Sequence, residues 1–61
     1  MSNFVEVKNT KGETYLINTK SIKEIKNING VHPGCKIFLF GEVEPVLVTT
    51  SYQDIRTALL G

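Results

Sequence analysis

Apolar residues in this chain come in short runs, and the longest, residues 37–40, has four members. A membrane-spanning helix needs about 20 apolar residues in succession. Short apolar runs bounded by turn-forming residues are instead typical of β-strands. The chain therefore has to build its core mainly from strands, and we expect no membrane association.

Apolar–polar alternation, enrichment in β-branched and aromatic residues, and short apolar runs together predict five strands, at residues 4–8, 13–17, 23–28, 35–40 and 46–49. A single helical or 3₁₀ turn is expected near residues 19–22. Gly- and Pro-containing segments separate the strands, with the richest at residues 29–34. This pattern indicates an α+β fold, namely a small meandering antiparallel β-sheet of about five strands with one C-terminal helix packed on one face.

The helix is predicted from its cap and from its apolar stripe. Thr50 or Ser51 precedes it, and Ser51 with Asp54 has the spacing of a capping box. Tyr52, Ile55 and Leu59 then recur at helical spacing and form one apolar face. We expect this face to close the core.

The length of 61 residues and the single cysteine limit the architecture. A chain of this size forms one domain, here residues 1–61, with about 60% of its unfolded surface buried. Cys35 has no partner for an internal disulfide, and small secreted domains usually need several. We therefore expect a reducing, cytoplasmic setting.

The residues that carry chemistry are too few for an active site. His32 is the one histidine, and with Cys35 it supplies two of the four ligands of a zinc site. No nucleophile–base pair or phosphate-binding glycine loop is present. The sequence predicts no enzyme, no metal site and no cofactor.

Charge gives a weak signal for nucleic acid. The formal net charge is +1, whereas nucleic-acid-binding domains usually carry a clear basic excess. Lys20, Lys23 and Lys26 recur at spacing three and, with Lys36, form a modest candidate patch for phosphate contacts. Aromatic platforms for single strands need interleaved basic residues, which the sequence around Phe38 lacks.

The most apolar strand suggests an interface. Alternation places Phe38 and Phe40 on one face and Ile37 and Leu39 on the other. One face has to meet the helix, and the other is left exposed in a monomer. We expect a contact with a second copy, or with another protein, through the segment Ile37, Phe38, Leu39 and Phe40.

Four motifs resemble the small FlbD-like proteins of bacteria and phages. They are Gly12-Glu13-x-Tyr15-Leu16-Ile17-Asn18, Ile22-x-x-Ile25, Ile37-x-Leu39-x-Gly41 and Val46-x-Val48-x-x-Ser51-Tyr52-x-x-Ile55. The resemblance covers residues 4–59 and implies a small non-enzymatic protein. A fainter similarity to half of a LytTR DNA-binding domain lies in the strand–strand–helix rhythm, but the loop at residues 30–34 has no Lys or Arg.

These observations favour a small, non-enzymatic, homo-oligomeric binding or regulatory module. Two alternatives remain open. One is a nucleic-acid-binding transcriptional regulator that uses the lysine patch, and the other is a phage-encoded inhibitor or virion component.

Overall fold

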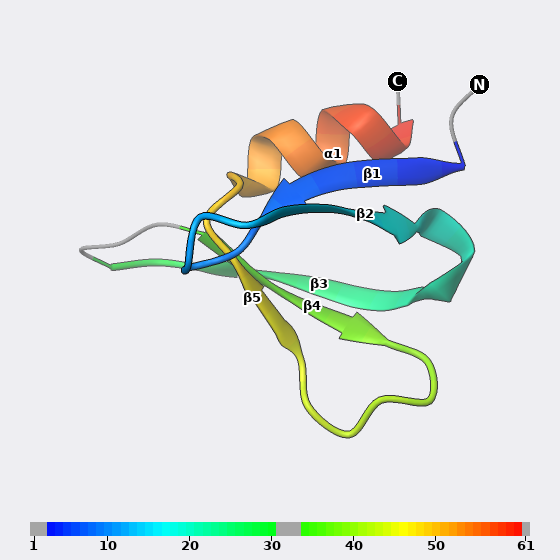
Figure 1. Ribbon diagram of the computed structural model, residues 1–61. Helices are drawn as coiled ribbons and strands as arrows, with labels where there is room; N and C mark the ends of the chain where they lie inside the picture. The colour runs from blue at the N-terminus through cyan, green and yellow to red at the C-terminus, as the bar shows by residue number, and fades with distance from the viewer. Residues whose placement is uncertain (1–2, 31–33, 61) are drawn as a thin grey trace.

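The computed structural model describes residues 3–30 and 34–60. Along them lie five strands and one α-helix (Figure 1), which confirms the predicted α+β class. In chain order the elements are β1 (Phe4–Lys8), β2 (Thr14–Asn18), the 3₁₀ turn η1 (Thr19–Ser21), β3 (Ile22–Ile28), β4 (Gly34–Leu39), β5 (Val46–Val48) and α1 (Tyr52–Leu60). The predicted strand boundaries are confirmed to within one residue.

β1 and β2 form a regular antiparallel hairpin, as predicted. Val5 and Val7 of β1 and Ile17 of β2 face the core and are buried. Asn9 holds the turn, because its Oδ1 accepts two backbone N–H groups from further along the loop, each at 2.9 Å. Gly12 closes the turn with a φ of 84°, in the left-handed region that favours glycine.

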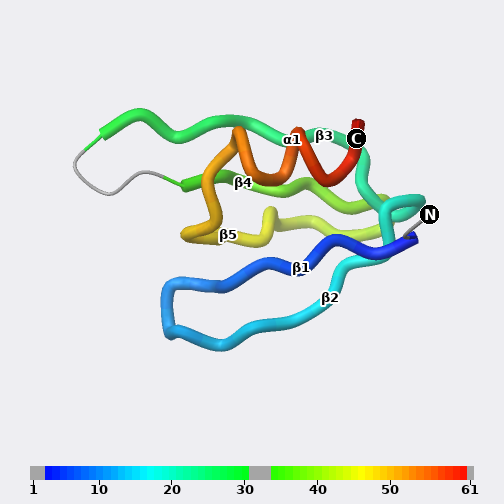
Figure 2. The backbone as a smooth tube through the Cα atoms, turned by 90° about the horizontal axis from the view of Figure 1, so that it is seen from above, coloured from blue at the N-terminus to red at the C-terminus, as the bar shows by residue number. Residues whose placement is uncertain are grey.

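The strands divide between two sheets, where the sequence predicted one continuous meander. β1 and β2 form one sheet, and β3, β4 and β5 form the other in that order. The division follows from η1, which is capped by the Asn18 Oδ1 accepting the Lys20 N–H at 2.9 Å and which turns the chain away from β2. The two sheets meet at an isolated bridge between Asn9 and Val48, and Figure 2 shows β5 beside β1.

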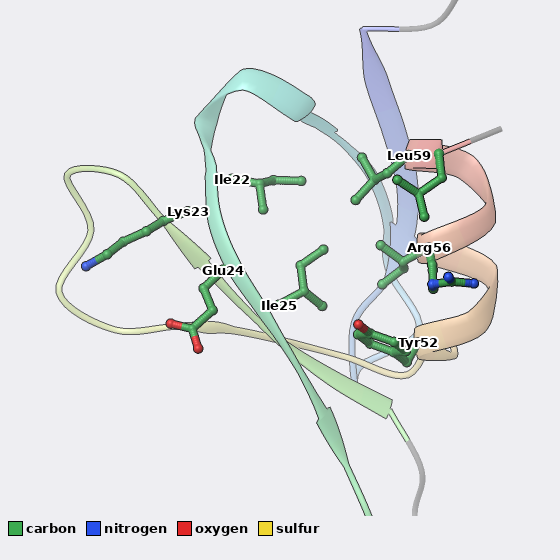
Figure 3. A pocket seen from close by; sticks show the side chains of 9 residues that line it. Ile22, Lys23, Glu24, Ile25, Tyr52, Arg56 and Leu59 are labelled. Carbon is green, nitrogen blue, oxygen red and sulfur yellow. The ribbon is translucent and has the colours of Figure 1, made fainter.

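β3 contains a β-bulge near its start. Its register against β4 shifts by one residue between Ile22 and Glu24, so that Lys23 is extra. Ile22 and Ile25 therefore face the same side although they are three residues apart, and both point toward α1 in Figure 3. Ile28 lies on the opposite face, because regular alternation resumes after the bulge. A spacing of three, which usually signals a helix, is produced here by a bulged strand.

The core lies between the two sheets and α1. Its buried hydrophobic residues are Val5, Val7, Ile17, Cys35, Ile37, Val48 and Ile55. α1 begins after Ser51, whose Oγ accepts the Asp54 N–H at 3.1 Å, which confirms the predicted cap. Ile55 is buried, whereas Tyr52 and Leu59 lie at the margin of the core and remain partly exposed. The apolar stripe of the helix thus closes the core at Ile55, and the core is open to solvent beside Tyr52 and Leu59.

Candidate interaction surfaces

The four residues predicted as an interface do not form one surface. Ile37 is fully buried and Leu39 is half-buried, and both belong to the inner side of β4. Phe38 is half-buried on the outer side, and Phe40 just beyond the strand is 64% exposed. The inclusion of Ile37 was wrong, because this side chain is already enclosed by the chain's own core. Phe38 and Phe40 are the members of the set that can meet a partner.

The outer face of the three-stranded sheet combines apolar and charged side chains. One cross-strand row runs from Lys26 through Lys36 to Leu47, and the next pairs Glu24 with Phe38. The Lys26 Nζ lies 5.6 Å from the centroid of the Phe38 ring and 3.9 Å from the Glu24 Oε2. The prediction that no basic residues interleave with these aromatic residues was wrong, because cross-strand pairing brings together lysines that are ten positions apart.

The four predicted lysines divide between three places. Lys26 and Lys36 are direct cross-strand partners on the outer face. Lys23 lies at the bulge, with its side chain on the side of β3 away from α1 (Figure 3). Lys20 belongs to η1, before β3 begins. The fold therefore supplies a pair of neighbouring cations rather than a row of four.

An open apolar groove separates α1 from β3 (Figure 3). Its volume is about 290 Å³, at the lower end of the range of ligand pockets. The side chains that face it from the two walls are mainly apolar, namely Ile22, Ile25, Tyr52, Ile55 and Leu59. Arg56 lies on the helix side of its rim, and no ion pair to Arg56 occurs within residues 3–30 and 34–60.

The groove is also bordered by the backbone of β3. Lys23 and Glu24 line it, yet Figure 3 shows both side chains on the far side of the strand, so their main-chain atoms form the border. β3 is the terminal strand of its sheet, and in the described part of the chain no strand pairs with its outer edge. This site was not predicted from the sequence. The Ile22-x-x-Ile25 spacing was the available signal, but strand order was needed to interpret it.

Cys35 has the environment of a structural thiol. It is fully buried, and its Sγ donates to the Thr50 carbonyl at 3.5 Å. Burial raises the pKa of the Cys35 thiol, because the thiolate is poorly solvated there. A nucleophilic cysteine needs the opposite shift. His32, the other residue of the weighed zinc pair, lies outside the described residues.

Within residues 3–30 and 34–60, no helix has the length and apolar character needed to span a bilayer. No protein-family model matches the chain, and none of the curated proteins or solved structures compared with it is significantly similar. The similarity to FlbD-like proteins and to LytTR domains stays a prediction.

Proposed function

We propose that the protein is a small, non-enzymatic binding module that associates with itself. The observation that carries this proposal is the distribution of apolar side chains. In the described residues seven hydrophobic residues are buried and five more pack against them partly buried, whereas eight large hydrophobic residues are exposed. Val43 is 98% exposed, Phe40 is 64% exposed and Leu47 is 47% exposed. Single exposed apolar residues are ordinary, but eight in so small a protein, with Tyr52, Leu59 and Leu60 beside an open groove, are typical of an interaction surface.

The environment of Cys35 supports two further parts of the proposal. A buried thiol with a raised pKa is a poor nucleophile, which supports a non-enzymatic role. A free buried thiol without a disulfide also supports a reducing, cytoplasmic location.

Sedimentation equilibrium tests self-association directly. We expect the average mass to rise above that of one chain as the concentration increases through the micromolar range. The matched variants are Leu47→Ser, on the outer sheet face, and Leu16→Ser, on the hairpin. A protein that stays monomeric up to millimolar concentration contradicts the proposal.

Binding of single-stranded nucleic acid is the second candidate. It is supported by Phe38 lying beside Lys26, in the cross-strand row next to that of the Lys26–Lys36 pair. Against it, the ammonium group of Lys26 lies over the Phe38 ring, where a base would have to stack, and Glu24 lies close to Lys26. We expect affinity no better than about 10⁻⁴ to 10⁻⁶ M at physiological salt.

Fluorescence anisotropy with mixed DNA and RNA oligonucleotides measures this affinity. Nanomolar binding that is lost in Lys26→Glu and Lys36→Glu, but kept in Lys11→Glu, favours the second candidate over the first.

A further inference from the structure

We propose that β3 pairs edge to edge with β3 of a second copy, antiparallel and in one register centred on Ile25. The inference rests on the proposed self-association and names the contact that produces it. Three features of the structure support it: an unpaired strand edge, a self-complementary pattern of charges along that edge, and an apolar groove that opens beside it.

The outer edge of β3 is a template for another strand. β3 has seven residues and is the longest strand described, and in residues 3–30 and 34–60 its partner is β4, on one side. Unpaired N–H and C=O groups along such an edge can bond a further extended segment. A second copy of β3 would join the two three-stranded sheets into one.

The side-chain faces restrict the register. Directly opposed residues in an antiparallel pair project to the same face of the sheet. The twofold axis therefore has to lie between the two copies of one residue, because inward-facing side chains then meet inward-facing ones. An axis at Glu24 opposes two carboxylates, and an axis at Lys26 opposes two ammonium groups, which is destabilising. An axis at Ile25 opposes Glu24 with Lys26 of the partner subunit, and does so twice. Among these three central positions, only Ile25 satisfies both faces and charges.

The same register covers the groove. Ile22 and Ile25 point into it and are half-buried in one chain. With the axis at Ile25, the two Ile25 side chains oppose each other on the inner side of the joined sheet. The partner's apolar side chains then lie in front of the opening that Tyr52 and Leu59 border. Lysines on an edge normally discourage pairing, and here Lys26 gains an acidic partner instead.

Charge reversal at the edge tests the register. Glu24 and Lys26 have side chains that are 52% and 60% exposed, so both tolerate substitution without loss of the fold. Glu24→Lys and Lys26→Glu each create like-charged opposed pairs, and we expect either variant to raise the dimer Kd about tenfold or more. The double variant Glu24→Lys/Lys26→Glu restores opposite charges and should return the Kd close to its original value.

Mixing the two single variants gives the decisive result. A copy with Lys at both positions opposes a copy with Glu at both, so an equimolar mixture should form heterodimers more tightly than either variant forms homodimers. Restoration in the mixture has to act between chains, because each variant has lost its own Glu24–Lys26 ion pair. Glu6→Lys and Lys11→Glu, both exposed and away from β3, are the matched controls and should leave the Kd unchanged.

Other outcomes overturn the inference in distinguishable ways. A wild-type protein that remains monomeric contradicts both the self-association and this contact. If the dimer Kd is unchanged in both edge variants but the dimer dissociates in Leu47→Ser, the protein self-associates and the contact is not the β3 edge. Weakening in both single variants without recovery in their mixture rejects the register centred on Ile25. A monomer whose β3 edge binds an extended peptide of another protein rejects the second copy as the occupant.

Discussion

The two faces of β4 belong to one strand but differ in burial. On the inner face Cys35 and Ile37 are completely buried. On the outer face Lys36 is exposed, Phe38 is half-buried under the ammonium group of Lys26, and Phe40 beyond the strand is largely exposed. Hydrophobicity alone does not explain the difference in burial between the two faces, since Phe40 is as apolar as any core residue. The difference arises from a second layer: α1 and the hairpin cover one face, and no described element covers the other.

The difference teaches where stability and binding are located in so small a protein. A core of seven residues has little redundancy, so each inward side chain contributes a large share of the free energy of unfolding. The outer face contributes little to folding and is free to contact a partner. Substitutions on the two faces should therefore differ sharply in effect.

Truncation of Ile37 should have the largest effect. Ile37→Ala removes a fully buried side chain from the central strand and should lower the free energy of unfolding by about 2–5 kcal/mol. Phe40→Ala removes a larger side chain from the exposed side and should change it by about 0.5 kcal/mol or less. Urea denaturation of both variants measures the contrast. Equal losses would show that the outer face is packed in solution.

Ile55→Ala should come next. This side chain is the buried contact of α1, and its loss should cost an amount near the lower end of about 2–5 kcal/mol. The groove beside it lets the helix shift and fill part of the cavity, which reduces the penalty. Leu60→Ala, at an exposed position of the same helix, is the control. A wild-type melting temperature in Ile55→Ala is incompatible with the observed packing of α1.

Gly34→Ala should have an intermediate effect. A Cβ at Gly34 meets the backbone carbonyl oxygen of Val48, where β4 and β5 approach closely. Backbone cannot yield as a flexible side chain can, so we expect a loss of about 1–3 kcal/mol. Gly30→Ala is the matched control, since a Cβ there meets nothing within 4 Å. Thermal unfolding followed by circular dichroism compares the two, and similar melting temperatures would contradict the close approach.

Lys36→Glu should have the smallest effect and the opposite sign. Lys36 directly opposes Lys26, and like charges in that position are destabilising. Replacement by Glu creates an attractive pair and should raise the stability by about 0.2–1 kcal/mol, with the gain reduced by added salt. Lys36→Gln separates the relief of repulsion from the new attraction. A loss of stability in Lys36→Glu would indicate that Lys36 has another role on this face.

Most of the local structure could be predicted from the sequence. Alternation, β-propensity and short apolar runs located all five strands, Ser51 and Asp54 located the start of α1, and the side chains of β4 were divided correctly between its two faces. These features depend on residues within a few positions of one another. The side-chain period of a strand or a helix then decides which of these residues lie on the same face. The predicted interface segment included both faces, because a run of four apolar residues does not show which face the rest of the chain covers.

The tertiary structure decided the arrangement of the strands and therefore the candidate sites. The division into two sheets, the bulge at Lys23, the free edge of β3 and the pairing of Lys26 with Lys36 all depend on which distant segments meet. That choice is made by the free energy of the whole core, in which α1 packs beside β1 of one sheet and β3 of the other. The sequence by itself determined what each segment becomes and which of its side chains share a face. Which edge and which face stay uncovered was decided by tertiary packing, because one short helix can cover one side of a sheet and no more.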